Sequence, residues 1–210
     1  MRAPIESSTT LAIENTWRGM MVTPPVGAVR PACCPHCASV GRHLDGDVVI
    51  EGNGERARQV VVPIFQDGLR FVRIACWSRR FLCTRCGKSI VVLPPGVVPG
   101  CLYSVAAMVV AWWTSWSPLG ADERRHEAVC APEGVDRRRD GVGADRRWRA
   151  PYRWATRLSA IFTGHLALAG GWRQEVERAL MMLAIQARDF GPEALARQAC
   201  RAHATYGTAA

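Results

Sequence analysis

Long hydrophobic runs are scarce in this chain of 210 residues. The most apolar stretch, residues 101–116, has sixteen residues and is shorter than the ~20 needed to span a bilayer. Its tryptophans, Trp112, Trp113 and Trp116, could mimic the aromatic belt of a membrane interface, but no second span follows. A buried helix explains the stretch better. We therefore expect neither a membrane segment nor a membrane partner.

Lysine is nearly absent, because Lys88 is the only one and arginine supplies almost all of the positive charge. Lys and Arg together number 27 against 18 Asp and Glu, which gives a formal net charge of +9. GC-rich codon usage explains an arginine bias of this kind. Guanidinium groups nevertheless suit phosphates and guanine edges better than ammonium groups do. The charge balance indicates an anionic partner, and double-stranded DNA is the natural candidate.

A secretory signal and an even cysteine count are also missing. Residues 1–30 lack the basic, apolar and small-residue regions of a signal peptide, and the nine cysteines are an odd number. We expect a reducing, cytoplasmic location. Because residues 1–30 contain Pro4, Pro24 and Pro25 and show no sustained periodicity, they are expected to form an irregular leader.

Catalytic chemistry has little support in the sequence. No nucleophile with a paired base is evident. Glu175 and Glu177 lie two residues apart, so they do not share a helical face and make a poor metal-binding pair. The sequence therefore predicts no enzyme and no small-molecule substrate.

Two Cys-x-x-Cys pairs are the most specific feature that is present. Forty-five residues separate them, and each pair can supply two thiolates from one tight turn. Zinc takes four such ligands in a tetrahedron, and a closed site of this kind stabilises a fold without catalysing a reaction. We predict one structural zinc ion, bound by Cys34, Cys37, Cys83 and Cys86.

Neighbouring residues leave some alternatives open. Cys33 and His36 are close enough in sequence to compete as ligands, but Cys34 gives the usual two-residue spacer with proline first. A thioredoxin-like redox pair is a poorer explanation, since there are two pairs and no βαβ pattern surrounds either. Gly87 follows the second pair where a knuckle turn often requires positive φ, and Ala38 takes the matching place in the first.

The pattern changes from strands to helices along the chain. Residues 58–65, 69–77 and 79–83 mix β-branched and aromatic residues with arginines and are expected to form antiparallel strands, with a flexible loop at 51–55. Prolines and glycines at 93–100 mark a boundary. Helical patterns follow at 101–116, 121–130, 144–163, 172–188 and 192–203.

The predicted fold class is therefore α+β, a small antiparallel zinc ribbon followed by a helical domain. We expect four segments along the chain: an irregular leader at 1–30, the zinc ribbon at 31–100, a helical region with room for a helix-turn-helix at 101–165, and C-terminal helices at 166–210.

Two groups of arginines are candidates for DNA contact. The first group lies on the predicted ribbon, where zinc-stiffened strands would place it near phosphates: Arg58, Arg70, Arg73, Arg79, Arg80 and Arg85. The second lies in a mixed-sign segment that fits either a solvated surface or nucleic-acid contact: Arg137, Arg138, Arg139, Arg146, Arg147, Arg149 and Arg153.

The order of these motifs resembles a known family. The run Cys-Pro-x-Cys, arginine-rich strands, Arg80-Phe81-x-Cys-x-x-Cys-Gly-Lys, and then Val92-Leu93-Pro94-Pro95 before a helix resembles the N-terminal zinc-ribbon region of bacterial insertion-sequence transposases and transposase-like proteins. The resemblance covers about residues 31–116. It implies a helix-turn-helix after the ribbon, with helices at 101–116 and about 121–130, and recognition of an element's terminal DNA.

The sequence departs from that family in two places. Gly141 and Gly143 interrupt the segment where a recognition helix would lie, and only sixty residues follow Ala150, too few for the ribonuclease-H-like catalytic domain. We therefore expect a non-catalytic, zinc-dependent DNA-binding protein, either free-standing or the recognition half of a degenerate or split transposase. A homodimer is compatible with this function.

The alternative is a protein-interaction module that docks through the tryptophan-rich helix at 101–116. RNA binding through the basic strands is a third hypothesis, with less support than the other two.

Overall fold

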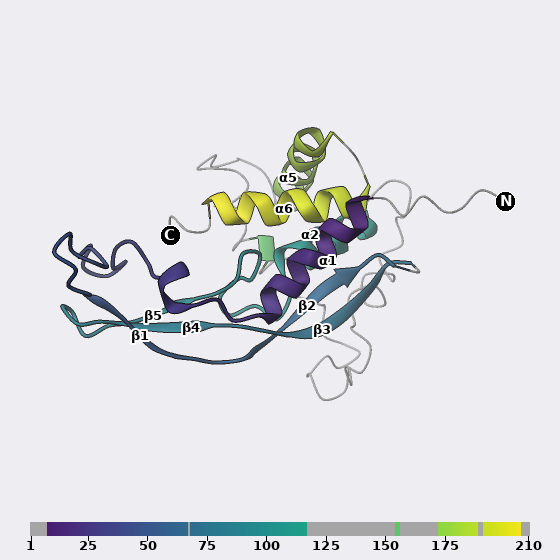
Figure 1. Cartoon of the computed structure of the whole chain (residues 1–210). Coiled ribbons are helices and arrows are strands. Elements are labelled where there is room, and N and C mark those ends of the chain that lie inside the picture. Colours follow the sequence, from purple (N-terminus) through teal and green to yellow (C-terminus); the bar gives the residue numbers. More distant parts are fainter. Residues whose placement is uncertain (1–7, 67, 117–153, 156–171, 189–190, 207–210) are drawn as a thin grey trace, which may run out of the picture.

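The computed structural model describes residues 8–66, 68–116, 154–155, 172–188 and 191–206. Its antiparallel strands and its helices confirm the α+β class (Figure 1). The elements, in chain order, are α1 (Ser8–Met21), the short 3-10 helix η1 (Val26–Ala28), β1 (Ile50–Glu55), β2 (Arg58–Ile64), β3 (Arg70–Cys76), β4 (Arg79–Cys83), β5 (Ser89–Val92), α2 (Val105–Trp116), α5 (Trp172–Ala187) and α6 (Pro192–Tyr206).

The strands form one long ribbon that carries two sheets. Strands β2 and β3 pair as a two-stranded sheet, while β4 lies between β1 and β5 in a three-stranded one. Only two residues separate β1 from β2 and β3 from β4, so the chain passes directly from one sheet into the other. The Arg56 N–H donates a hydrogen bond to the Ser78 carbonyl, 2.8 Å away, where the sheets meet. Figure 1 shows the helices over one end of this ribbon and β1, β4 and β5 at the other.

The three predicted strands are confirmed, but the predicted loop at 51–55 is wrong. These residues belong to β1, which pairs with β4 from Ile50 opposite Cys83 to Glu55 opposite Arg79. Glycine disfavours a strand interior unless a bulge requires it. Here the register shifts between Gly52 and Glu55, and Gly54 has a positive φ of 87°. The glycines therefore form a β-bulge rather than a flexible loop.

The predicted irregular leader is wrong for residues 8–21, which form α1. Trp17 and Met20 lie one helical turn apart and are both buried. The Trp17 indole N–H donates to the Pro63 carbonyl over 3.0 Å, and the Trp77 indole N–H donates to the Gly19 carbonyl over 3.2 Å. These tertiary contacts order α1 against the ribbon. The sequence shows no strong periodicity that would predict this helix.

Helix α2 runs through the centre of the helical layer and packs on α6 and β2. It begins at Val105 and not at residue 101, because the preceding residues pair with β2. The Val61 N–H donates to the Leu102 carbonyl, and the Ser104 N–H donates to the Val61 carbonyl. The Ser104 hydroxyl then accepts a hydrogen bond from the Ala107 N–H over 3.1 Å, which is a helix N-cap.

The predicted burial of the tryptophan-rich helix is confirmed for Trp112, which is 2% exposed. The helices expected at 172–188 and 192–203 correspond to α5 and α6. Among the described helices, none is both long enough and apolar enough to cross a membrane. The helices expected at 121–130 and 144–163 lie largely outside the described residues, and so does the second half of any helix-turn-helix.

Two hydrophobic clusters hold the fold together. The larger joins α2, α5 and α6 to α1 and to the hairpin of β2 and β3. The smaller lies within the three-stranded sheet, with Ile50, Phe81 and Ile90 packed against Cys34 and Cys83. The expected boundary at 93–100 separates the strands from α2, α5 and α6 in the sequence, but β2 and β3 share their core with these helices. Only the far end of the ribbon has a core of its own.

A half-buried histidine, His203, links α6 to the loop before α2. The Gly96 N–H donates to His203 Nδ1 over 3.0 Å, and burial lowers the pKa of His203 below its ordinary value of 6.5. Between the lowered pKa of His203 in the folded chain and its ordinary value of 6.5, the unfolded chain binds the proton more readily than the folded chain does. We therefore expect the free energy of unfolding to decrease as pH falls below about 6.5.

Chemical denaturation from pH 8 to pH 5 measures this dependence. The variant His203→Asn keeps an acceptor but cannot titrate, so its stability is expected to vary less with pH. His43→Asn, at an exposed position, is the control and should follow the wild type. Equal pH dependence in the wild type and in His203→Asn would contradict the prediction.

Candidate metal centre

The structure brings together the four cysteines that the sequence singles out. The sulfur atoms of Cys34, Cys37, Cys83 and Cys86 all lie within 4.8 Å of one another. Cys34 Sγ lies 3.7 Å from Cys86 Sγ, and Cys37 Sγ lies 3.7 Å from Cys83 Sγ. A tetrahedral zinc–thiolate site with bonds of about 2.3 Å has sulfurs about 3.8 Å apart. The cluster therefore has the dimensions of a four-thiolate metal site.

Both Cys-x-x-Cys pairs lie in turns with the same hydrogen bonds. In the first, the Cys34 N–H donates to the Ser39 carbonyl and its own carbonyl accepts from Ala38. In the second, Cys83 bonds in the same way to residues five and four positions later, Lys88 and Gly87. The repetition of this pattern 49 residues apart indicates two metal-binding knuckles and not a chance meeting of cysteines.

Each knuckle turns through a residue with positive φ. This residue is Gly87 in the second knuckle, with φ of 69°, and Ala38 in the first, with φ of 57°. Glycine adopts this conformation without steric cost, whereas alanine does so at a cost of roughly 1 kcal/mol. The sequence expectation about these two positions is confirmed, and the first knuckle is the more strained.

The competing ligands lie outside the cluster. Cys33 is exposed and bridges to Val40 in a short antiparallel contact, and His36 is also exposed. The His36 backbone N–H instead donates to Cys34 Sγ over 3.4 Å. Among the described residues, the metal-ligating group contains Cys34 and neither of these two side chains.

Electrostatics within the cluster favours a bound cation. The hydroxyl of Ser39, 3.2 Å from Cys37 Sγ, lowers the pKa of Cys37 to about 6. The Lys88 backbone N–H lowers the pKa of Cys86, but desolvation and the neighbouring cysteine thiols outweigh it and raise this pKa to about 12. Four thiolates cannot be packed together without a compensating charge. A divalent cation supplies that charge and allows all four to ionise.

Backbone contacts hold the two knuckles in register. The Thr84 N–H and hydroxyl both donate to the Val49 carbonyl, which ties the second knuckle to the start of β1. The Gly41 N–H donates to the Ala32 carbonyl over 2.7 Å, and the Gly41 carbonyl accepts from Val49 and Ile50. Gly41 therefore connects the first knuckle to the same strand. The sequence gives no signal for the roles of Gly41 and Thr84, because they depend on tertiary contact.

The candidate arginines of the ribbon divide into two groups. Arg58 donates to the Cys101 carbonyl, and Arg79 donates to the Pro24 carbonyl over 2.8 Å and lies 3.7 Å from the Glu55 carboxylate. These two side chains fasten the ribbon to neighbouring segments. The exposed group, in which Arg73 also bonds to Gln59, contains Arg70, Arg73, Arg80 and Arg85.

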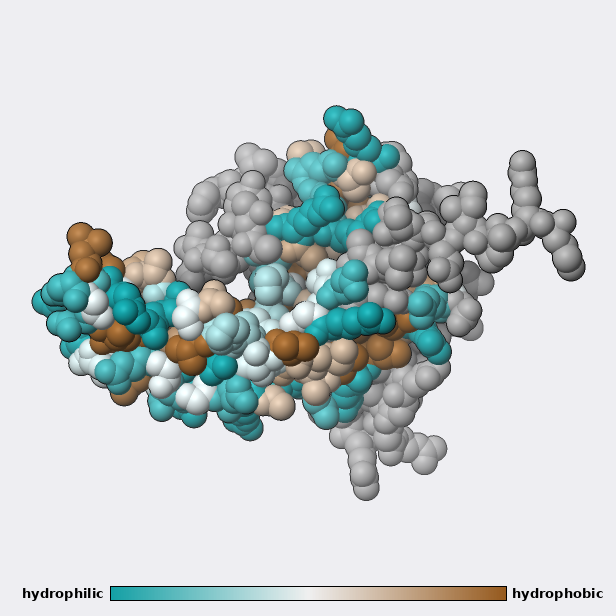
Figure 2. All heavy atoms as spheres, in the orientation of Figure 1, coloured by the Kyte–Doolittle hydropathy of each residue, from teal (hydrophilic) through white to brown (hydrophobic). Residues whose placement is uncertain are grey.

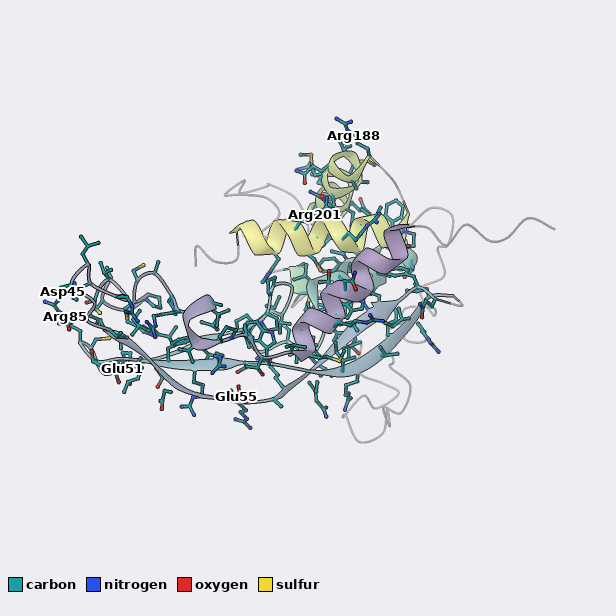
Figure 3. The ribbon with its side chains drawn as sticks, in the orientation of Figure 1. Asp45, Glu51, Glu55, Arg85, Arg188 and Arg201 are labelled. Atoms are coloured by element: carbon teal, nitrogen blue, oxygen red, sulfur yellow. The ribbon has the colours of Figure 1, made fainter. Side chains whose placement is uncertain are left out.

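Figure 3 places Arg85 beside the knuckles at the strand end of the molecule. The other seven candidates, Arg137, Arg138, Arg139, Arg146, Arg147, Arg149 and Arg153, lie outside the described residues. No family model, curated protein or solved structure matches the chain.

Proposed function

We propose that this protein is a non-catalytic, zinc-dependent DNA-binding protein. The observation that carries the proposal is the convergence of four cysteine sulfurs from two matching knuckles at distances that fit tetrahedral thiolate coordination. Four protein ligands leave no open position for water or substrate, so the metal has a structural role. The chemistry of the donors favours Zn²⁺, because thiolates are soft ligands and zinc accepts a tetrahedral arrangement readily.

The exposed arginines supply the second part of the proposal. Arg70 and Arg73 lie on β3, Arg80 lies on β4, and Arg85 lies in the second knuckle, so the exposed cations are distributed along the ribbon. A ribbon stiffened by metal at one end and by the helical core at the other holds these cations with little freedom. Such an arrangement suits contacts to the phosphate backbone, which position a protein on DNA without reading its sequence.

In this proposal the helical part of the chain recognises the DNA sequence. By analogy with the zinc-ribbon region of insertion-sequence transposases, α2 is the first helix of a helix-turn-helix and the arginine-rich segment after residue 116 contains the element that enters a groove. The net charge of +9 supports an anionic partner for the chain as a whole.

Fluorescence anisotropy with labelled duplex DNA tests the DNA-binding proposal. Binding of zinc-loaded protein is expected to weaken linearly on a log-log plot against salt, with a slope of about −0.9 for each phosphate contact. Alanine at Arg70, Arg73, Arg80 or Arg85 should each reduce the slope by about 1 if the side chain contacts a phosphate.

Alanine at Arg58 or Arg79 provides the matched control. These variants remove the same charge from positions that bond to the protein itself, so they should lower stability more than they change the salt slope. An absence of binding at low salt would reject the DNA proposal, and an unchanged slope in all four exposed variants would reject the ribbon as the contact surface.

The alternative function is a protein-interaction module that docks through the tryptophan-rich helix α2. That function needs exposed indole rings. Of the tryptophans in α2 whose side chains the structure describes, Trp112 is buried and Trp113 is half-buried, and this burial counts against the alternative.

A further inference from the structure

The four cysteines of the metal centre differ in how far solvent can reach them. Cys34 and Cys83, the first cysteine of each knuckle, are 1% and 0% exposed. Cys86 is half-buried and Cys37 is exposed, so the second cysteine of each knuckle lies on the solvent side. The 3.2 Å contact between Cys37 Sγ and the Ser39 hydroxyl is itself exposed. Cys37 is therefore the ligand that solvent reaches most easily.

The packing of the three-stranded sheet explains this asymmetry. The first cysteine of each knuckle packs into the small apolar cluster with Ile50 and Phe81, and Cys86 packs against the edge of that cluster. Among the four ligands, Cys37 alone lies outside it. Figure 3 places Arg85, in the second knuckle, at the strand end of the molecule, and Figure 2 shows this end projecting from the helical part. A small molecule dissolved in water would meet the cluster at Cys37 first.

The chemistry of an exposed cysteine ligand is that of a nucleophile. A cysteine that binds a metal is a thiolate, and thiolates attack the O–O bond of hydroperoxides. The Cys37 sulfur would form a bond to one peroxide oxygen and become a sulfenic acid, while the O–O bond breaks and the other oxygen leaves as hydroxide. A second thiolate can then attack the oxidised sulfur, form a disulfide and displace a second hydroxide. The two sulfurs together lose the two electrons that reduce the peroxide.

Cys83 is well placed to supply the second thiolate. Its sulfur lies 3.7 Å from Cys37 Sγ, whereas Cys34 Sγ lies 3.7 Å from Cys86 Sγ. A disulfide bond of about 2.05 Å requires Cys37 and Cys83 to approach by about 1.7 Å. This disulfide would join one knuckle to the other. The two thiolates that remain cannot complete a four-thiolate site, so the metal would be released.

We propose that Cys37 is an oxidation site at which a hydroperoxide converts the metal-bound protein into a metal-free form with a Cys37–Cys83 disulfide. The inference rests on the metal centre of the proposed function and adds redox control to it. Loss of the metal would loosen β1, β4 and β5, whose apolar cluster is small, and with them Arg80 and Arg85. A thiol reductant and fresh zinc would restore the original form, because a disulfide is a reversible oxidation product.

Treatment of the full zinc-loaded chain with hydrogen peroxide tests the proposal. A chromogenic chelator follows the release of zinc, and mass spectrometry identifies the disulfide. The expected result is the loss of one zinc ion for each Cys37–Cys83 disulfide formed, with recovery of bound zinc after reduction and resupply of the metal.

The sequence allows the disulfide to be assigned without ambiguity. Trypsin cleaves after Arg85 and so separates Cys83 from Cys86. The two cysteines of the first knuckle stay on one peptide, but His36 lies between them, and fragmentation of that peptide distinguishes them. Peptide mapping therefore reports which cysteine of each knuckle takes part.

Histidine variants test whether exposure selects Cys37. Cys37→His keeps a zinc ligand, as in natural Cys₃His sites, but removes the oxidation site, so peroxide should release zinc several-fold more slowly than from the wild type. Cys86→His makes the same change at the half-buried ligand and should release zinc as fast as the wild type. Cys33→Ser removes the exposed cysteine outside the cluster and should change neither the rate nor the disulfide.

Failure of this inference is distinguishable from failure of the proposed function. A wild-type chain that holds no zinc before oxidation would reject the metal centre, and the inference with it. A zinc-loaded chain that keeps its metal in peroxide, or that loses it with disulfides that leave out Cys37, would overturn the inference alone.

Discussion

Replacement of Cys34 by serine is expected to unfold the three-stranded end of the protein while the helical core stays folded. The apolar cluster at that end is small, with Val49, Ile50, Phe81 and Ile90 packed against the two buried cysteines. A cluster of this size cannot hold three strands and two knuckles without a metal. Structural zinc contributes about 10–16 kcal/mol in zinc-finger peptides at neutral pH, and the loss of one of four thiolates would remove a part of that stabilisation.

Hydrogen exchange followed by mass spectrometry measures the loss. Amides in β1, β4 and β5 should exchange rapidly in Cys34→Ser or after chelation, whereas amides of α2 and α6 should keep most of their protection. Cys33→Ser is the matched control, since it makes the same change one residue earlier at an exposed position outside the cluster. Equal effects of the two serine variants, or an equal loss of protection in α2, would contradict the prediction.

Replacement of Gly41 by alanine is expected to destabilise the same end by about 3 kcal/mol or more. A Cβ atom at this position would lie 2.3 Å from the Pro31 carbonyl oxygen and 3.3 Å from that of Ala32. Both are backbone atoms immediately before the first knuckle, so they cannot move aside as a flexible side chain would. The displacement would also break the 2.7 Å hydrogen bond from the Gly41 N–H to the Ala32 carbonyl.

Thermal unfolding and competition with a metal chelator measure this effect. Gly41→Ala should lower both the melting temperature and the apparent zinc affinity. Gly19→Ala is the control, because a Cβ there meets no heavy atom within 4 Å and α1 should gain up to about 1 kcal/mol from the better helix former. A Gly41→Ala variant with wild-type stability and zinc affinity would show that Gly41 does not fix the first knuckle.

The parts of the fold that the sequence predicts are those decided by local chemistry. The strands around Val60–Val62 follow from β-branched residues, and the helices α5 and α6 follow from apolar periodicity. The four cysteines are recognised because metal chemistry imposes a spacing within each pair. The choice of Cys34 over Cys33 follows from the same spacing.

The parts that the sequence does not predict depend on distant contacts. Strand β1 is not predicted because glycines such as Gly52 and Gly54 disfavour a strand on local propensity. In the structure, the bulge and the packing of Val26 against Gly52 require small residues at these positions. Helix α1 is missed because its order comes from Trp17 and from Trp77, 60 residues later.

The roles of the arginines could not be predicted for the same reason. Arg79 and Arg80 are adjacent in sequence and identical in chemistry. Strand alternation turns Arg79 inward toward Pro24 and Glu55 and leaves Arg80 exposed. Which of these side chains are exposed therefore depends on tertiary contacts such as the one between Arg79 and the N-terminal segment at Pro24.

X-ray absorption at the zinc K edge, on protein purified with its metal, tests the metal centre most directly. The four-cysteine site predicts one zinc ion per chain surrounded by four sulfur atoms at about 2.3 Å, with no nitrogen or oxygen neighbour. Cys34→Ser should replace one of these sulfurs or release the ion, and Cys33→Ser should leave the spectrum unchanged. A first shell that contains nitrogen or oxygen in the wild-type protein, or a chain that binds no zinc, would contradict the proposed centre.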